Sequence, residues 1–163
     1  MGAGKSFLSK YMTQQYNWKV VDLDDYIIEK EGATITELMA ISEEHFRVLE
    51  SKYLAELASL DFDLVSLGGG TPCSEENWKV ISQNYTSIYL KWSGQTLFNR
   101  LKDNKLDRPL IAKLEDPDLI YFIDKSLAER AKYYERADII FDGDQQKIEE
   151  LLAILSDYAI RKR

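Results

Sequence analysis

The first residues of the chain have the types and order of a phosphate-binding loop. The sequence starts Met1-Gly2-Ala3-Gly4-Lys5-Ser6, and Gly4-Lys5-Ser6 matches the end of the pattern G-x-x-x-x-G-K-[ST]. Glycines let backbone N–H groups curl around phosphate oxygens, and the N-terminus of a following helix attracts the same anion. In this chemistry Lys5 reaches the β- and γ-phosphates of a nucleotide, and the Ser6 hydroxyl is a ligand of Mg²⁺.

The loop is incomplete in this sequence, because the first glycine of the pattern and the strand that normally feeds it would both precede Met1. Either the start of the chain is trimmed or assigned too late, or the nucleotide site is damaged. We favour the first interpretation, since a central parallel strand is buried on both faces and costly to lose. Taken alone, these residues are also compatible with a flexible Gly-rich start.

Two further groups follow predicted strands. Asp22-Leu23-Asp24 ends an apolar run, and ligands of open α/β sheets bind at the carboxyl ends of strands. These carboxylates could hold Mg²⁺ through water and orient a hydroxyl, or they could only cap the next helix. Gly68-Gly69-Gly70 costs backbone entropy, which favours close approach of the backbone to a ligand over a flexible turn.

Arginines supply the remaining candidate chemistry. Arg47 and Glu50 are three residues apart on a predicted helix, so they share a face. By themselves the two residues are compatible with an exposed ion pair of small value. Arg108 lies in a charged, Pro-containing loop, which by itself is typical of a solvated run of charged residues. An arginine on a closing loop can also stabilise a transferring phosphoryl group.

Short apolar runs alternate with helical segments along the chain. The pattern predicts strands over 18–23, 63–67, 87–92 and 138–141, and helices over 6–15, from Thr34, and over 42–60, 75–83, 96–102, 118–136 and 145–160. A capping box, Thr34-x-x-Glu37, starts the second helix. The sequence therefore predicts an α/β fold with a mostly parallel sheet flanked by helices, with a mobile loop over 103–117.

Composition narrows the class of protein. The 163 residues carry a net charge of −7, which disfavours nucleic acid as a partner. The single Cys73 fits a reducing cytoplasm, and with the single His45 it excludes His/Cys metal clusters. We find no apolar run long enough to span a membrane and no secretory signal. We expect a cytoplasmic monomer.

These motifs, in this order, resemble the shikimate kinase family of P-loop, nucleoside-monophosphate-kinase-like proteins. The resemblance covers essentially the whole chain and rests on the loop at Gly4 and on five later segments, DLD, FRVLE, SLGGG, RPL and RAKYY. It implies a five-stranded parallel sheet in a single kinase domain over 1–163, a substrate-binding insertion at about 32–60 and a lid at about 103–117. It also implies ATP and Mg²⁺ as cofactors, and phosphorylation of the shikimate 3-hydroxyl in the pathway to chorismate and aromatic amino acids.

The resemblance assigns roles position by position. It makes Lys5, Asp24 and Arg108 catalytic, and the substrate contacts Asp24, Arg47, Glu50, Gly68, Gly69, Gly70 and Arg130. The nucleotide contacts are Gly2, Ala3, Gly4, Lys5, Ser6, Phe7, Arg100, Arg108 and Gln146, with Mg²⁺ on Ser6 and Asp22. Arg100 would stack on the adenine base, and the loop 142–146 would close the adenine pocket. Trp18, Trp78, Trp92 and Tyr134 are expected to pack in the core or in a groove.

Two alternatives stay open at this point. Another small-molecule kinase of the same fold, such as a gluconate kinase, would share the phosphate loop, although the glycine triplet with Arg47 and Arg130 favours a cyclic carboxylate substrate. A non-catalytic nucleotide-binding module would explain the incomplete loop, and it would bind ATP without turnover.

Overall fold

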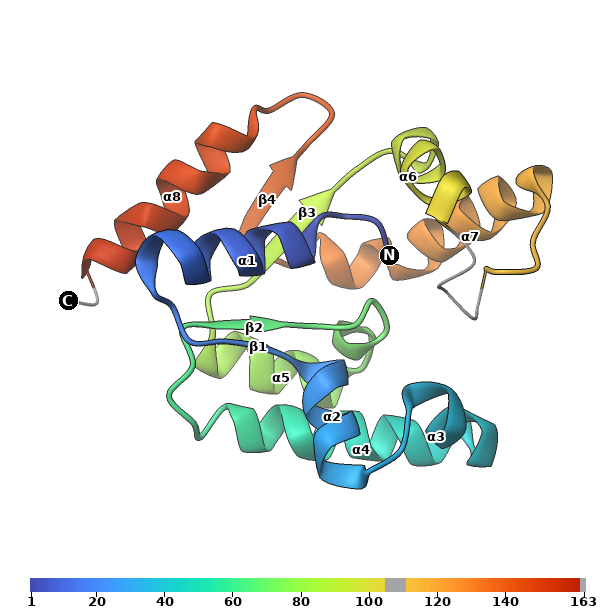
Figure 1. Ribbon diagram of the computed structural model, residues 1–163, viewed down its shortest axis with the longest axis horizontal. Coiled ribbons are helices and arrows are strands. Elements are labelled where there is room, and N and C mark those ends of the chain that lie inside the picture. The colour runs from blue at the N-terminus through green and yellow to red at the C-terminus, as the bar shows by residue number, and fades with distance from the viewer. Residues whose placement is uncertain (105–110, 162–163) are drawn as a thin grey trace. The chain divides into compact units, whose positions relative to one another are not determined.

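Strands and helices alternate along the chain (Figure 1), and the computed structural model describes residues 1–104 and 111–161. The strands are β1 (Val20–Asp22), β2 (Leu64–Ser66), β3 (Ile88–Lys91) and β4 (Ile139–Asp142). The α-helices are α1 (Lys5–Tyr16), α2 (Leu23–Glu31), α3 (Ile35–Ile41), α4 (Glu43–Leu57), α5 (Glu75–Asn84), α6 (Gly94–Leu101), α7 (Asp116–Tyr134) and α8 (Ile148–Arg161). Two short 3₁₀ turns, η1 (Thr71–Cys73) and η2 (Lys102–Asn104), complete the described elements.

The strands pair in parallel, as predicted. β1 pairs with β2, which places Asp22 opposite Ser66, and β3 pairs with β4, which places Lys91 opposite Asp142. Within the described ranges these are two separate two-stranded sheets, in place of the five-stranded sheet that the resemblance implies. The α/β class with parallel strands and flanking helices is confirmed.

The chain forms two compact units. The β1–β2 unit is Phe7–Ser87, and the β3–β4 unit consists of Met1–Ser6 with Ile88–Arg163. The predicted acid-binding groups at Asp24, Arg47 and the glycine triplet lie in the first unit, and the phosphate-loop residues up to Ser6 lie in the second. The single domain over 1–163 stays a prediction.

The core of the β1–β2 unit comes from four helices, α2, α3, α4 and α5. Its buried residues are Leu23, Ile27, Leu38, Phe46, Leu49, Tyr53, Leu54, Leu57, Trp78 and Ile81. Those on α4 recur at three- and four-residue steps, which is the pattern of an amphipathic helix. The Ser42 hydroxyl caps α4 by accepting a hydrogen bond from the His45 N–H, and Thr34 and Glu37 form the predicted capping box of α3. The Ser42 cap fixes where α4, the helix that carries Arg47, begins.

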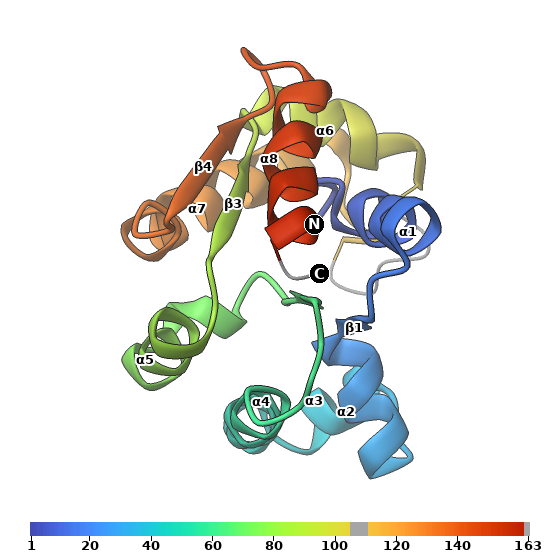
Figure 2. The same cartoon turned by 90° about the vertical axis from the view of Figure 1, so that its left-hand side faces the viewer.

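The core of the β3–β4 unit lies between α6 and α7, where Leu97, Leu101, Ile111, Leu119 and Ile123 are buried together. Figure 2 shows α7 and α8 on opposite sides of the β3–β4 pair. Buried Phe141 on β4 and Leu151 on α8 belong to the same unit. The start of the chain is therefore anchored to a unit whose strands have helices on both sides.

Sequence reasoning missed α2 and misplaced several ends. Leu23 was expected to end a strand, but it begins α2, because the Asp22 carboxylate caps that helix by accepting from the Asp24 N–H. Gly32 then ends α2 in the left-handed conformation, at φ 66°. Leu60, the last residue of the helix predicted over 42–60, lies beyond α4 and is exposed. The predicted loop over 103–117 includes the end of η2 and the start of α7, and its residues 105–110 lie outside the described part.

Candidate active site

The start of the chain has the backbone of a phosphate-binding loop. Gly2 and Gly4 have φ angles of 71° and 99°, which L-residues with a side chain rarely adopt. α1 begins at Lys5, with Lys5 half-buried and Ser6 exposed, and it has no acidic residue in its first turn. The positive end of the helix dipole is therefore not neutralised by its own side chains.

Two side chains hold the carbonyl groups of this loop. The Trp92 indole Nε1 donates to the Ala3 carbonyl at 2.9 Å, and Arg100 Nη1 donates to the Gly2 carbonyl at 3.2 Å. The side chain of Leu101 lies so close to Gly2 that an added Cβ would be 3.1 Å from its Cγ. Arg100, predicted to stack on adenine, here lies over the Trp92 ring, and Trp92 packs against the α6–α7 core as expected of a core residue. Its hydrogen bond to the loop was not predicted from the sequence.

The segment from Asp142 to Gln146 is held by its own polar groups. The Gln146 side chain accepts from the Asp142 N–H at 2.9 Å, so it closes a tight turn. Asp144 accepts from the Thr96 hydroxyl and from the Ser93 N–H, each at 2.6 Å, and these hydrogen bonds lower the pKa of Asp144. Gly143 packs so closely against the Trp92 ring that an added Cβ would lie 2.2 Å from it. Asp144, which the sequence did not single out, thus joins this turn to the start of α6.

Asp22 and Asp24 lie at the junction of β1 and α2. Asp22 Oδ1 accepts from the Asp24 N–H at 3.0 Å, so the capping role considered for these acids is real for Asp22. The Asp24 carboxylate lies against Gly68, where an added Cβ would be 3.3 Å from its Oδ1. Asp24 and the start of the glycine triplet are therefore neighbours, whereas Asp25 is exposed.

Arg47 lies between two carboxylates and the glycine loop. Its Nη1 is 2.5 Å from Glu50 Oε2, and its Nη2 is 3.1 Å from Glu43 Oε1. An added Cβ on Gly70 would lie 2.7 Å from Nη1, so a side chain at this position would require the guanidinium to move. Burial acts to lower the pKa of Arg47, but the hydrogen bonds and charges of Glu50 and Glu43 outweigh it and raise the pKa. Arg47 is therefore a permanent, oriented cation beside the loop.

Gly70 and Gly68 have ordinary backbone angles, since neither has a positive φ. The requirement for glycine at these positions is room for side chains, namely the Arg47 guanidinium and the Asp24 carboxylate. The backbone of the glycine triplet therefore lies close to the Arg47 and Asp24 side chains, which are the groups expected to bind the ligand.

Glu50 is the buried centre of this arrangement. Its Oε1 accepts from the Thr71 hydroxyl at 2.7 Å, and the Thr71 carbonyl accepts from Asn77 Nδ2 at 2.8 Å. The alternative of an exposed ion pair for Arg47 and Glu50 is wrong, because Glu50 is only 1% exposed. Sequence reasoning missed Thr71 and Asn77, although their positions directly after the glycine triplet and in the first turn of a helix are a usable signal.

The remaining predicted residues are Arg130, Arg108 and Phe7, together with Tyr134 as a packing residue. Arg130 is half-buried on α7 in the β3–β4 unit, so a grip on one anion shared with Arg47 stays a prediction. On the same helix Tyr134 contacts Tyr89 at 4.9 Å between ring centroids, in agreement with a packing role. Arg108, the predicted lid arginine, lies outside the described residues. Phe7 is exposed at the start of α1.

The donor atoms at the ends of β1 and β2 suit Mg²⁺. In the described ranges no three His, Cys, Asp or Glu side chains lie together as a metal cage. Mg²⁺ usually keeps several waters and takes one or two protein oxygens besides phosphates, so such a cage is not required. Ser66, opposite Asp22 in the sheet, has a buried hydroxyl with no hydrogen-bond partner in the described structure. The hydroxyl and carboxylate oxygens at this strand edge fit a hydrated magnesium ion.

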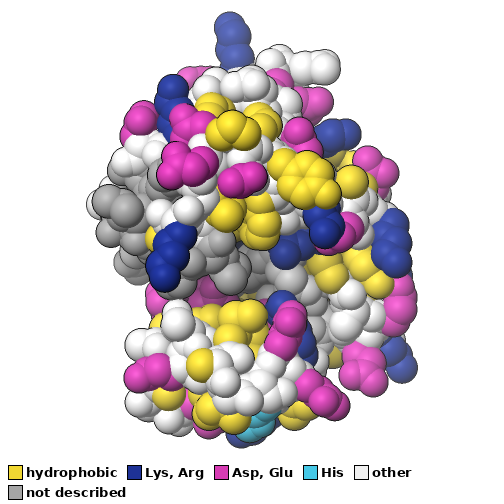
Figure 3. Space-filling view, turned by 90° about the vertical axis from the view of Figure 1, so that its right-hand side faces the viewer, with side chains coloured by type: hydrophobic (Ala, Val, Ile, Leu, Met, Phe, Trp, Pro, Cys, Tyr) yellow, Lys and Arg dark blue, Asp and Glu magenta, His cyan; other side chains and the backbone are white. Residues whose placement is uncertain are grey.

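The surface carries charges of both signs. Figure 3 shows Lys and Arg side chains interspersed with Asp and Glu on the face drawn, where the exposed His45 is also visible. No helix within residues 1–104 and 111–161 is long and apolar enough to cross a membrane.

Comparison with known proteins leads to the family that the sequence motifs resemble. The family model "Shikimate kinase" matches residues 1–158. A shikimate kinase from Bacteroides thetaiotaomicron is 34% identical over 166 residues, covering 94% of this chain and 95% of the relative. One from Flavobacterium johnsoniae is 35% identical over 160 residues, covering 96% of this chain and 93% of the relative.

Solved structures lead to the same family. The crystal structure of shikimate kinase from B. thetaiotaomicron has a TM-score of 0.83 at 33% identity, covering 99% of this chain and 90% of that one. Shikimate kinase from Acinetobacter baumannii in complex with shikimate shares the fold, with a TM-score of 0.83 at 24% identity over 100% of this chain and 90% of that one. The family match spans nearly the whole sequence, including the phosphate loop at the start of α1 and the Arg47–Glu50 pair beside the glycine triplet. The chain belongs to the shikimate kinase family.

Proposed function

We propose that the chain transfers the γ-phosphoryl group of ATP to the 3-hydroxyl of shikimate, with Mg²⁺ as metal cofactor, in the pathway to chorismate and aromatic amino acids. Membership of the shikimate kinase family supports this reaction. The observation that carries the assignment of residues is the grouping of Arg47, Asp24 and the glycine triplet in the β1–β2 unit. An oriented cation, a carboxylate and a tight backbone loop suit a small ring that bears a carboxylate and hydroxyl groups.

Arg47 would bind the shikimate carboxylate. A guanidinium fork matches the two oxygens of a carboxylate, and Lys cannot reproduce that geometry. Glu50 holds the fork in place, and Gly68, Gly69 and Gly70 would line the same pocket with backbone groups. Arg130 would add a second positive charge from α7.

Asp24 would act on the reacting hydroxyl. In the reaction the 3-oxygen of shikimate forms a bond to the γ-phosphorus, the bond from that phosphorus to the β–γ bridging oxygen breaks, and ADP leaves. The hydroxyl proton must leave its oxygen during this step, and Asp24 would orient the hydroxyl and accept the proton. Its position beside Gly68 supports a contact with the same ligand that the glycine triplet would bind.

The phosphate loop would hold ATP. Backbone N–H groups of Gly2, Ala3, Gly4, Lys5, Ser6 and Phe7 would surround the phosphates, and the Lys5 ammonium would neutralise charge on the transferred group. Arg100 and the turn that ends at Gln146 would form the adenine side, since Arg100 already presents a planar cation over Trp92. Arg108 would reach the phosphoryl group from the lid.

Ser6 and Asp22 would hold Mg²⁺, Asp22 through water. When bound, the metal supplies positive charge to the β- and γ-phosphate oxygens. Ser6 and Asp22 provide hard oxygen donors of the kind that Mg²⁺ prefers. We also propose that the protein works in the cytoplasm as a monomer without nucleic-acid or membrane partners, for which the net charge of −7 and the single cysteine are the support.

The test is a coupled assay of ADP release with Mg²⁺-ATP and a panel of acceptors. We expect turnover with shikimate and none above background with gluconate. Turnover with gluconate alone would assign the chain to another kinase of this fold. Tight ATP binding without turnover on any acceptor would favour a non-catalytic nucleotide-binding module.

A further inference from the structure

A buried carboxylate is costly unless both oxygens are paired, and Glu50 meets this condition through two different partners. Oε2 accepts from Arg47 on the same helix, and Oε1 accepts from Thr71, which follows the glycine triplet. Glu50 is 1% exposed and Thr71 is fully buried at 0%. Water therefore does not replace the Thr71 hydroxyl without local opening of the structure.

Thr71 is itself held from two sides. Its N–H donates to the Gly68 carbonyl at 3.3 Å, and its carbonyl accepts from the Asn77 side chain at 2.8 Å. Asn77 is 4% exposed, and its own N–H donates to the Ser74 hydroxyl that caps α5. The start of α5 thus fixes the Thr71 hydroxyl in direction as well as in place.

The two ion pairs of Arg47 differ in strength, because one carboxylate is exposed to water and the other is buried. Glu43 is mostly exposed, with a side chain 69% accessible, so its ion pair is screened by water. Glu50 is dry, and a charge-assisted hydrogen bond there is both shorter and stronger. The direction of the guanidinium is accordingly set by Glu50, and that of Glu50 by Thr71.

We propose that Thr71 is a positioning residue for the acid substrate: its hydroxyl fixes Glu50, Glu50 fixes the Arg47 fork, and the fork is thereby held against Gly70 on the same loop as Thr71. This proposal rests on the proposed function, because it takes Arg47 as the group that binds the substrate carboxylate. It assigns to Thr71 no contact with substrate or nucleotide. Its effect is on the affinity and orientation of the acid.

The decisive variant is Thr71→Val, which keeps the shape of the side chain but leaves Oε1 of Glu50 unpaired. We expect the Kd for shikimate, measured by calorimetry without nucleotide, to rise about 5- to 100-fold. The KM for ATP should stay within about twofold, since Thr71 holds only the acid side. Thr71→Ser restores the hydroxyl and should return the shikimate Kd to within about threefold of the wild-type value.

The control is Thr36→Val, the same change at an exposed position on α3, which should leave both constants unchanged. A merely structural role for Thr71 would lower the melting temperature and raise both constants together, and that result would overturn the proposal. Wild-type-like shikimate binding by Thr71→Val would overturn it as well. If circular dichroism shows Thr71→Val unfolded, Thr71→Cys takes its place with the same expected selectivity for shikimate. Failure of the wild-type chain to bind shikimate would instead overturn the proposed function.

Discussion

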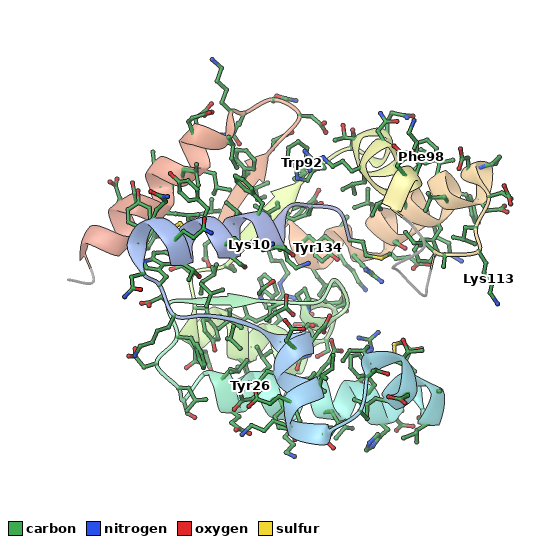
Figure 4. All side chains as sticks on the ribbon, viewed as in Figure 1. Lys10, Tyr26, Trp92, Phe98, Lys113 and Tyr134 are labelled. Carbon is green, nitrogen blue, oxygen red and sulfur yellow. The ribbon has the colours of Figure 1, made fainter. Side chains whose placement is uncertain are left out.

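The guanidinium of Arg100 lies over the indole ring of Trp92, with its Cζ 3.6 Å from a ring centroid. The same two side chains donate to the consecutive carbonyls of Gly2 and Ala3. Cation–π contact and hydrogen bonding therefore act together on the start of the chain. Figure 4 labels Trp92, which comes from the turn between β3 and α6. The phosphate loop is thus held by residues far away in the sequence. Ala3 and Trp92 are 89 positions apart, and Gly2 and Arg100 are 98 apart.

Replacing Trp92 should weaken ATP binding selectively. Trp92→Phe keeps an aromatic face for Arg100 but removes the N–H that holds the Ala3 carbonyl. Since one such hydrogen bond is worth about 1 kcal/mol, the KM for ATP should rise roughly two- to tenfold with the shikimate constant unchanged. Steady-state kinetics measures both values, and Trp18→Phe in the other unit is the matched control. An unchanged KM for ATP in Trp92→Phe would show that the loop does not depend on this bond.

Gly70→Ala should damage the site more than Gly68→Ala. A methyl group on Gly70 would lie 2.7 Å from the Arg47 guanidinium, whereas on Gly68 it would lie 3.3 Å from the Asp24 carboxylate. Displacement of the fork should raise the KM for shikimate about 10- to 100-fold in Gly70→Ala, with a smaller change in Gly68→Ala. Comparison of the two variants by kinetics, with melting temperatures as a check on folding, tests the ranking. The reverse order would mean that Gly70 does not make room for Arg47.

Arg47→Ala should separate the two substrates. Loss of a charged, bidentate partner costs about 1.5–3 kcal/mol, so shikimate affinity should fall roughly 10- to 150-fold. Affinity for ATP should be largely intact, because the ion pairs of Arg47 are made with Glu43 and Glu50 on its own helix. Titration of each substrate in separate calorimetric experiments gives the comparison. Equal loss of both affinities contradicts the role assigned to Arg47.

Asp24→Asn should preserve the fold and abolish most of the turnover. Asn keeps the size of the side chain and the space beside Gly68, but it cannot accept the hydroxyl proton. General-base catalysis contributes about 10²- to 10⁴-fold, and we expect kcat to fall within that range. Circular dichroism and shikimate binding serve as the checks on structure. Near-normal turnover would remove Asp24 from the mechanism.

The link between α2 and α4 predicts a pH dependence of stability. Tyr26, labelled in Figure 4, donates to Glu56 at 2.7 Å, and Lys30 pairs with Glu56 at 3.1 Å. The Tyr26 hydrogen bond, followed by that of Lys30, lowers the pKa of Glu56 below its ordinary value of 4.5. Because the folded pKa is depressed, the charged form stabilises the fold above pH 4.5, and this stabilisation is lost as the pH falls through the folded pKa.

Glu56→Gln should therefore melt at a lower temperature than the wild-type chain at pH 7, and the difference should shrink progressively below pH 4.5. Thermal unfolding followed by circular dichroism at a series of pH values measures it. Glu29→Gln, at an exposed position on α2, is the control. A difference in melting temperature that stays constant into the acid range would exclude the charge of Glu56 as the cause.

Local patterns in the sequence determined most elements and the residue types of the site. The Thr34–Glu37 capping box, the apolar spacing on α4 and the Gly-Lys-Ser start of α1 act over a few residues, so the sequence alone reveals them. The missed helix α2 had equally local signals in Asp22 and Gly32, but acidic residues after a strand are equally typical of a ligand site.

Only the tertiary structure decided how the chemical groups are held. Glu50 and Thr71 are 21 positions apart and Ala3 and Trp92 are 89 apart, and no periodicity links such pairs. Whether Arg47 forms an exposed ion pair or a buried, directed one depends on what covers Glu50, which is set by packing of α4 against η1 and α5. Burial decides the strength of a charged contact because it removes the competing water, and burial is a property of the folded chain.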